Sequence, residues 1–109
     1  MPELRQGEIW WANLPQPVGR RPVLILTRSD AVARLTNVTI APITRTIRDN
    51  SAEVVLSPED GVPSICAVTL ENILTIRRII LDRRIVRLKA GPMREVFAAI
   101  RFVFAMPTD

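Results

Sequence analysis

The run Gly7-Glu8-Ile9-Trp10-Trp11-Ala12-Asn13-Leu14 and the run Pro22-Val23-Leu24-Ile25-Leu26-Thr27 determine the fold class. Both consist mainly of β-branched, aromatic and aliphatic residues, which favour extended backbone in a pleated sheet. Pro15 and Pro17 follow the first run, and proline cannot donate to a neighbouring strand, so the first strand ends before them. The second run is apolar without alternation, which is typical of a strand buried on both faces. The sequence therefore predicts two strands joined by a loop over residues 15–21.

Further short strands are expected downstream, at residues 38–41, 53–56 and 65–70. The first of these ends near Pro42-Ile43-Thr44, and Ser57-Pro58-Glu59-Asp60-Gly61 has the composition of a turn. Residues 29–36 have mixed character and form a connection. Several short strands with turn signals between them predict a small barrel or curled sheet.

The last third of the chain predicts a helix. Gly91-Pro92 is a suitable start, because proline at the first helical position gives up only a hydrogen bond that has no partner there. One apolar stripe follows at helical spacing, made of Met93, Val96, Phe97, Ile100 and Phe104. Arg94 and Arg101 lie on the opposite side. Phe102 falls nearer this polar face and indicates a second buried surface, such as a subunit contact. The predicted fold is mainly β, a barrel of the SH3-like type, with a C-terminal amphipathic α-helix.

Length and charge narrow the class of protein. With 109 residues, the chain is predicted to be one small domain over residues 1–109. The formal net charge is +4, and Lys89 is the only lysine among 15 basic residues. Arginine offers a planar, always-charged fork that suits phosphate, so a phosphate-bearing partner is favoured. Codon usage in a GC-rich genome explains the arginine bias equally well.

Several chemistries are excluded by residue type. There is no histidine, so histidine acid–base catalysis and histidine metal sites are unavailable. Cys66 is the only cysteine and lies in an apolar run, where a buried, inert thiol is expected. We expect neither a metal nor a cofactor. No apolar stretch approaches the ~20 residues that span a bilayer, and the N-terminal residues lack a signal-peptide core. A soluble, cytoplasmic protein without membrane contact is predicted.

Four segments occur in the order seen in the MazF/PemK endoribonuclease toxins, which the chain resembles. They are Gly7-Glu8-Ile9-Trp10-Trp11, Gly19-Arg20-Arg21-Pro22-Val23-Leu24-Ile25-Leu26, Ala41-Pro42-Ile43-Thr44 and Glu71-Asn72-Ile73-Leu74-Thr75-Ile76. In the family these correspond to a first strand, a second strand with R-P-V-L, a third-strand end with P-I-T, and a short helix. No single segment is specific, but four in register cover almost the whole chain. Without them, the residues leave open a basic binding module or an unusual nuclease.

The resemblance implies a sequence-specific, metal-independent endoribonuclease that cleaves single-stranded RNA, either mRNA or a tRNA or rRNA loop. The 2′-hydroxyl attacks its own phosphate and leaves a 2′,3′-cyclic phosphate and a 5′-hydroxyl, which inhibits translation and growth. The family's catalytic arginine and threonine fall on Arg21 and Thr44. Arginine stays protonated, so Arg21 is expected to stabilise charge and donate hydrogen bonds, and Thr44 can donate to a phosphate oxygen. The alternatives are a surface arginine and a threonine that caps the backbone.

Candidate RNA-binding residues surround this pair in the sequence. They are Gly19, Arg20, Arg45, Thr46, Arg48 and Asn72. The arginines are expected to contact neighbouring phosphates, and Thr46 and Asn72 to read base edges. Five further arginines form a second cluster, made of Arg77, Arg78, Arg83, Arg84 and Arg87. This cluster is expected to be an RNA-binding patch, a solvated face or a protein interface. Trp10 and Trp11 are expected in core or dimer packing rather than under a base.

The resemblance also implies partners. The family forms homodimers, and apolar residues at Trp10, Leu14 and Phe102 fit an exposed contact of this kind. A cognate antitoxin with an acidic C-terminal tail is expected to block the RNA groove, and DNA is expected to be contacted only through the antitoxin. The positive charge of the chain suits such a tail.

Three departures from the family pattern bear on activity. The segment between Leu14 and Arg21 is shorter than usual and lacks the common Ser-Glu-Gln, and Leu74 replaces an arginine. Arg77 stands where an acidic residue is common. The sequence leaves open whether these changes weaken or redirect cleavage. Two alternative functions remain at this stage: a non-catalytic toxin that binds a protein such as DNA gyrase, and an RNA- or DNA-binding autoregulator.

Overall fold

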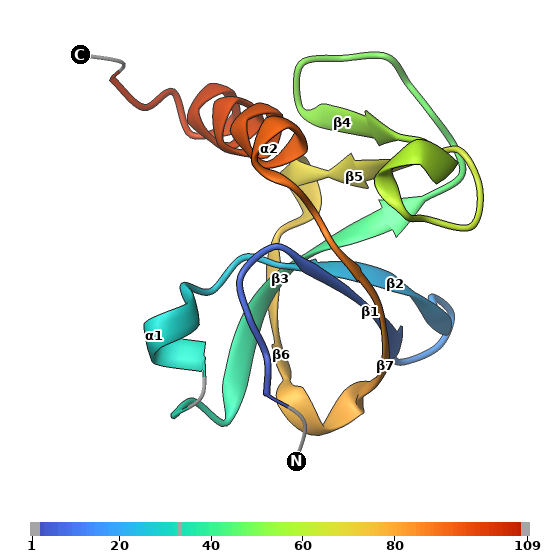
Figure 1. Cartoon of the computed structure of the whole chain (residues 1–109), viewed down its shortest axis with the longest axis vertical. Coiled ribbons are helices and arrows are strands. Elements are labelled where there is room, and N and C mark those ends of the chain that lie inside the picture. Colours follow the sequence, from blue (N-terminus) through green and yellow to red (C-terminus); the bar gives the residue numbers. More distant parts are fainter. Residues whose placement is uncertain (1–2, 33, 108–109) are drawn as a thin grey trace.

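The computed structural model describes residues 3–32 and 34–107. Seven strands form one sheet in this part of the chain: β1 (Glu8–Asn13), β2 (Arg20–Ile25), β3 (Asn37–Thr44), β4 (Glu53–Leu56), β5 (Cys66–Thr69), β6 (Leu74–Arg77) and β7 (Leu81–Arg87). The α-helices are α1 (Ser29–Val32) and α2 (Ala90–Val103). Single 3₁₀ turns form η1 (Pro58–Asp60), η2 (Leu70–Asn72) and η3 (Arg78–Ile80). The mainly β fold with a C-terminal helix is therefore confirmed (Figure 1).

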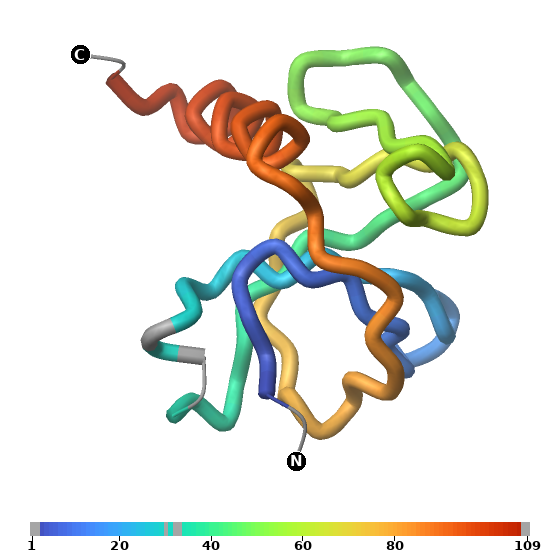
Figure 2. The backbone as a smooth tube through the Cα atoms, in the orientation of Figure 1, coloured from blue at the N-terminus to red at the C-terminus, as the bar shows by residue number. Residues whose placement is uncertain are grey.

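Strand β3 organises the sheet because it changes partners along its length. Its first residues, 37–40, pair with β6, residues 40–42 pair with β2, and residues 43–44 pair with β5, all antiparallel. The strand order is β4-β5-β3-β2-β1-β7, with β6 on the other part of β3. The sheet therefore curls into a barrel half, made of β1, β2, β3, β6 and β7, and a β4–β5 hairpin beside α2 (Figure 1). Figure 2 shows the connection from β6 to β7 looping round beneath the barrel half.

Two apolar cores lie on the two sides of the curled sheet. One fills the barrel half and includes Trp10, Val23 and Ile40, while the other lies under α2 and includes Leu24 and Val96. Successive residues of β2 enter different cores, which explains why its sequence is apolar without alternation. Each large side chain removed from water contributes roughly 1.5–3 kcal/mol. The expected burial of the second strand on both faces is confirmed.

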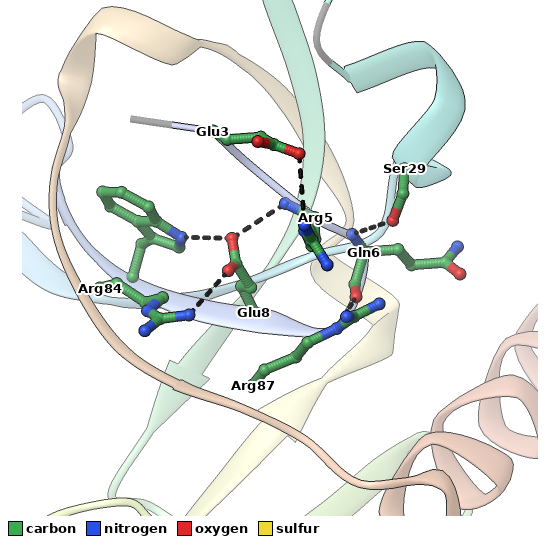
Figure 3. A network of polar contacts seen from close by, with 8 residues as sticks. Glu3, Arg5, Gln6, Glu8, Ser29, Arg84 and Arg87 are labelled. Atoms are coloured by element: carbon green, nitrogen blue, oxygen red, sulfur yellow. Dashed lines mark hydrogen bonds and ion pairs between the residues drawn. The ribbon is translucent and has the colours of Figure 1, made fainter. Parts of the chain in front are cut away.

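A buried carboxylate fastens the start of β1 (Figure 3). Glu8 is only 2% exposed, and its Oε1 accepts hydrogen bonds from the Arg5 backbone N–H at 2.9 Å and from Trp10 Nε1 at 3.1 Å. Its Oε2 accepts from an Arg84 guanidinium nitrogen at 3.2 Å. The three donors belong to the N-terminal segment, to β1 and to β7, so Glu8 joins these three parts of the chain.

Helix α2 packs on the sheet through a narrower stripe than the spacing predicts. Val96 and Ala99 are buried, and Met93 and Ile100 pack against the same core. Phe104 was expected in the stripe but is 60% exposed, because the helix ends at Val103 and the chain turns away. The described residues contain no helix with the length and apolar character needed to cross a membrane.

Other expectations need correction. The predicted helix over residues 71–76 is a single 3₁₀ turn, η2, followed by strand β6. Strands β6 and β7 carry the second arginine cluster except Arg78, which lies in η3, and they were not predicted as strands. Trp10 and Leu14, expected on an exposed contact surface, are 4% and 8% exposed and belong to the barrel core. Phe102 is 60% exposed, as its place near the polar face of the helix predicts.

Candidate functional site

Arg21 and Thr44 lie on neighbouring strands at the same end of the sheet. Strands β2 and β3 pair antiparallel, with Val23 opposite Pro42. Arg21 lies two residues before Val23 and Thr44 two residues after Pro42, so the pairing of the strands brings both residues to the same end of the sheet. Two residues that are distant in sequence are therefore neighbours because of strand pairing.

Two cavities meet at this pair. The first, called here the Trp11 lobe, has a volume of about 410 Å³ and is lined by Trp11, Arg20, Arg21, Pro22, Ile43, Thr44, Arg45, Thr46, Val62, Pro63, Ser64, Cys66 and Ile85. The second, the Asn72 lobe, has a volume of about 570 Å³ and is lined by Leu14, Pro15, Gln16, Val18, Arg21, Pro42, Thr44, Thr46, Arg48, Thr69, Asn72 and Leu74. Only Arg21, Thr44 and Thr46 line both. The catalytic candidates thus stand at the junction of a two-lobed groove.

Arg21 is half-buried, and its guanidinium is available to a ligand. Across residues 3–32 and 34–107, no hydrogen bond or ion pair occupies its side chain. Its backbone is held on one side by β1, where Ala12 is opposite it. A guanidinium has five N–H donors and no acceptor. The geometry therefore presents a positioned cation with unused donors to the groove.

Thr44 is a capping residue and a groove residue at once. Its Oγ1 accepts a hydrogen bond from the Thr46 backbone N–H at 3.1 Å. This contact uses an acceptor lone pair and leaves the hydroxyl proton free, because a threonine hydroxyl has one donor and two acceptor positions. The backbone contact therefore orients the oxygen while the O–H remains able to donate to a phosphate oxygen in the groove.

The segment after Thr44 is fixed by a carboxylate. Glu53 accepts hydrogen bonds from the backbone N–H groups of Arg48, at 2.9 Å, and Asp49, at 2.8 Å. This holds the segment that carries Arg45, Thr46 and Arg48 against the start of β4. Local backbone order is thus supplied without using the arginine side chains.

The candidate binding residues divide between the lobes. Arg45 lines the Trp11 lobe, Arg48 and Asn72 line the Asn72 lobe, and Thr46 lines both. Gly19 lines neither lobe. With φ of +71°, it closes the loop between β1 and β2, and its carbonyl accepts the Leu14 N–H at 3.2 Å.

Arg20 has partners within the protein. One guanidinium nitrogen donates to Asn13 Oδ1 at 3.3 Å and also contacts the Asp82 carboxylate. The guanidinium carbon lies 4.9 Å from the centre of the Trp11 ring, so the planar cation covers part of that ring. Arg20 therefore belongs to a wall of the groove instead of standing free beside it.

Some groove residues were not singled out from the sequence. Trp11 was expected in core or dimer packing; it is only half-buried and lines the groove, so it lies outside the core, whereas Trp10, its neighbour in β1, is buried. Alternation along a strand is the signal that separates the two. Val62, Pro63 and Ser64 form another wall, and nothing in their residue types indicates this. The arginines of β6 to β7 line neither lobe.

Cys66 is buried, as expected, beneath the Trp11 lobe. Burial raises the pKa of its thiol, and the nearby Asp60 carboxylate raises the pKa further. A raised thiol pKa disfavours the thiolate, which is the reactive form. The expected inert role of Cys66 is consistent with this environment.

Three features define the structural class of this protein. They are the curled antiparallel sheet, the C-terminal helix packed on it, and the arginine–threonine pair in a two-lobed groove. Residues 5–104 match the family described as PemK-like, MazF-like toxin of type II toxin-antitoxin system. The chain belongs to this family.

Individual relatives agree with the assignment. The chain is 38% identical over 96 residues to a protein named probable endoribonuclease MazF5 of Mycobacterium tuberculosis, with 87% of each chain covered. The solved structure of Mycobacterium tuberculosis toxin MazF-mt6 superposes with a TM-score of 0.85 and 37% identity, over 93% of this chain and 99% of that chain. An endoribonuclease in complex with its cognate antitoxin, from a mycobacterial species, shares the fold at a TM-score of 0.85 and 19% identity, over 97% of this chain and 99% of that chain.

Proposed function

We propose that this protein is an endoribonuclease toxin that cleaves single-stranded RNA at a short sequence without a metal ion. The observation that carries the proposal is that Arg21 and Thr44 are shared by both lobes of the groove. A single strand crossing that junction would place one phosphate between the two side chains and one nucleotide in each lobe. The relatives named endoribonucleases support the same reaction class.

The proposed chemistry uses a nucleophile that the substrate supplies. The ribose 2′-oxygen forms a bond to the adjacent phosphorus, and the bond from phosphorus to the 5′-oxygen of the next nucleotide breaks. Overall, the 2′-hydroxyl proton is lost and the departing 5′-oxygen gains one, leaving a 2′,3′-cyclic phosphate and a 5′-hydroxyl. No water nucleophile is needed, so the groove has only to orient the strand and stabilise charge.

The two side chains then have separate roles. The Arg21 guanidinium neutralises the extra negative charge on the pentacoordinate phosphorus with donors that no group occupies among residues 3–32 and 34–107. The Thr44 hydroxyl, oriented by the Thr46 N–H, donates to a non-bridging oxygen. Donors fixed before the reaction are effective because they need no reorganisation when charge develops. Arg45, Arg48, Thr46 and Asn72 bind flanking phosphates and base edges.

The protein is proposed to act with an antitoxin. A solved structure that shares this fold contains a cognate antitoxin. The net charge of +4 and the free guanidinium of Arg21 suit an acidic, partly disordered tail laid along the groove. Released from it, the toxin would cut cytoplasmic RNA, either mRNA or a tRNA or rRNA loop, and would stop translation and growth.

A homodimer is proposed from an exposed apolar surface beside α2. Val55, Phe102, Phe104 and Met106 are 47–60% exposed, and Val55 and Phe102 line one shallow hollow. Sedimentation velocity tests this: Phe102→Glu is expected to shift the protein towards monomer. Ile79→Glu changes a residue that is 70% exposed on η3 and serves as the matched control. Equal sedimentation of wild type and Phe102→Glu would contradict the surface assignment.

The function is tested by incubating a long single-stranded RNA with the purified protein in EDTA and mapping the ends by primer extension. Cuts at one short sequence with 5′-hydroxyl ends are expected. Arg21→Ala should lower the rate by about 10²–10³-fold, the loss typical of a transition-state donor. Arg94→Ala removes an exposed arginine outside both lobes and should cut normally. A folded protein that arrests growth without cutting RNA would instead indicate a protein target such as DNA gyrase.

A further inference from the structure

The apolar walls of the Trp11 lobe suit a nucleobase better than a phosphate. Its walls are mostly apolar and come from separate segments: Trp11 of β1, Pro22 and Ile43 of β2 and β3, Val62 and Pro63 after η1, and Ile85 of β7. A phosphate on these walls would lose hydration without compensation. The faces of a nucleobase are flat and apolar, and its polar atoms lie at the edge. A cavity of about 410 Å³ falls in the range of small-ligand sites.

One wall of the lobe is a preformed stacking surface. The Arg20 guanidinium lies over the Trp11 ring at 4.9 Å and is tethered there by Asn13 and Asp82. Both tethers contact the same guanidinium nitrogen, so the other nitrogens keep donors that point elsewhere. Splayed bases of single-stranded RNA stack on aromatic rings and on guanidinium planes. Arg20 and Trp11 together therefore form a stack in one wall of the lobe, on which a base can lie beside Arg21.

The polar groups in the Trp11 lobe are matched to carbonyl oxygens. The lining side chains include the guanidinium of Arg45 and the hydroxyls of Ser64 and Thr46, and no carboxylate or amide occurs among them. The side chain of Arg45 makes no hydrogen bond or ion pair within the described residues. The hydroxyls can donate or accept, but a guanidinium can only donate, so Arg45 pairs with base carbonyls and repels amino groups. The Asn72 lobe lacks Arg45 and carries the amides of Gln16 and Asn72, which can both donate and accept.

We propose that the Trp11 lobe is a nucleobase subsite next to the scissile phosphate, in which the Trp11–Arg20 wall stacks the base and Arg45 selects a carbonyl at the position where cytosine and adenine carry an amino group, as in uracil or guanine. The inference rests on the proposed ribonuclease function and adds a specificity determinant to it. Trp11 is the stacking residue, and Asp82 is a positioning residue that acts through Arg20.

Two uncleavable probes test the subsite by binding alone. Hepta-uridylate and hepta-cytidylate with 2′-O-methyl groups lack the nucleophile and differ only in the polar edge of the base. Hepta-uridylate is expected to bind about tenfold more tightly and to quench the fluorescence of Trp11, since the other tryptophan, Trp10, is buried in the barrel core. Equal binding of the two probes, or no change in fluorescence, would overturn the proposal.

Variants separate the stacking role of the Trp11–Arg20 wall from the base-selecting role of Arg45. Trp11→Leu keeps the lobe apolar and should abolish the quenching while weakening hepta-uridylate binding about tenfold. Arg45→Ala should reduce the preference between the probes. Asp82→Asn changes an exposed side chain and leaves Trp11 in place. It should weaken the binding of both probes. This variant keeps the test valid if Trp11→Leu does not fold. Unchanged binding in Asp82→Asn and Arg20→Ala would contradict the role of the wall.

Maps of the cleavage positions distinguish failure of the proposed base subsite from failure of the proposed ribonuclease function. If wild type cuts RNA and Arg45→Ala keeps the same base preference at every position beside the cut, the subsite is wrong and the ribonuclease function stands. If wild type cuts no RNA, the ribonuclease function fails. The expected result is an Arg45→Ala enzyme that still cuts and has lost base preference at one position only.

Discussion

Glu8→Gln is the substitution that best tests how the fold is fastened (Figure 3). Glu8 is 2% exposed and accepts from the Arg5 N–H, Trp10 Nε1 and Arg84. Glutamine can keep its oxygen towards the first two donors, but its amide NH₂ then faces the Arg84 guanidinium. One acceptor is lost, and the two remaining hydrogen bonds change from charged to neutral.

The size of the effect follows from these contacts. Hydrogen bonds to a charged group contribute about 1.5–3 kcal/mol and neutral ones about 0.5–1.5 kcal/mol. The Arg84 side chain is 59% exposed, so solvent screens its part of the interaction. Removing a buried charge also relieves some desolvation. The free energy of unfolding is therefore expected to fall by about 2 kcal/mol, or roughly 10 °C in Tm. Glu8→Ala leaves the buried Trp10 Nε1–H and the part-buried Arg5 N–H without their acceptor and should cost about 4 kcal/mol.

Urea unfolding, followed by far-UV circular dichroism at one protein concentration, measures these changes. Glu3→Gln is the matched control, because the Glu3 side chain is 71% exposed in its ion pair with Arg5 and should change stability by less than about 0.5 kcal/mol. A Glu8→Gln protein as stable as the Glu3→Gln protein would refute the assignment of Glu8 as the group that joins the N-terminal segment, β1 and β7.

Two further predictions concern the segment around the Trp11 lobe. Gly61 has φ of +99°, and a Cβ there would lie 2.5 Å from Val86 Cγ2, so thermal denaturation of Gly61→Ala should show a loss of about 3 kcal/mol. Gly91→Ala meets only the end of the Arg94 side chain, at 3.9 Å, and should be neutral or stabilising; equal losses in the two variants would contradict the close packing of Gly61. Because the pKa of Cys66 is raised, its protonated thiol is favoured in the native state. The contribution of this thiol to the stability of the native state is complete below the ordinary thiol pKa, and it is lost as the pH rises through the raised pKa. Iodoacetamide should therefore alkylate native Cys66 more slowly than urea-unfolded protein at pH 8–9 (roughly the ordinary thiol pKa), and equal rates would show an accessible thiolate.

The sequence predicted those elements whose apolar pattern is strong on its own. The strands around Trp10, Leu24 and Val54 and the helix around Val96 fall close to their observed bounds. Strand β7 was missed because its arginines point outward along an exposed edge, and only Arg84 turns towards a buried partner. Local composition cannot distinguish such an edge strand from a charged loop. The helix end at Val103, which exposes Phe104, likewise has no clear signal in the spacing.

The site was predictable only in part. Arg21 and Thr44 were selected through the family resemblance, and their juxtaposition depends on the β2–β3 register, which no local pattern specifies. Core packing was one expectation for Trp11, and the structure excludes it; its residue type suits a core and a groove equally. The wall formed by Val62, Pro63 and Ser64 comes from a turn that packs across the molecule. Tertiary contacts of this kind leave no trace in composition.

The most direct test of the account is a double-mutant cycle on single-turnover RNA cleavage in EDTA, using wild type, Arg21→Ala, Thr44→Val and the double variant. Both side chains are argued to act on one phosphate, so the double variant should be far less impaired than the product of the single losses predicts. Binding of the uncleavable 2′-O-methyl probe should change much less than the rate. Single variants that cut at the wild-type rate, or losses that multiply independently, would contradict the claim that Arg21 and Thr44 form one catalytic site.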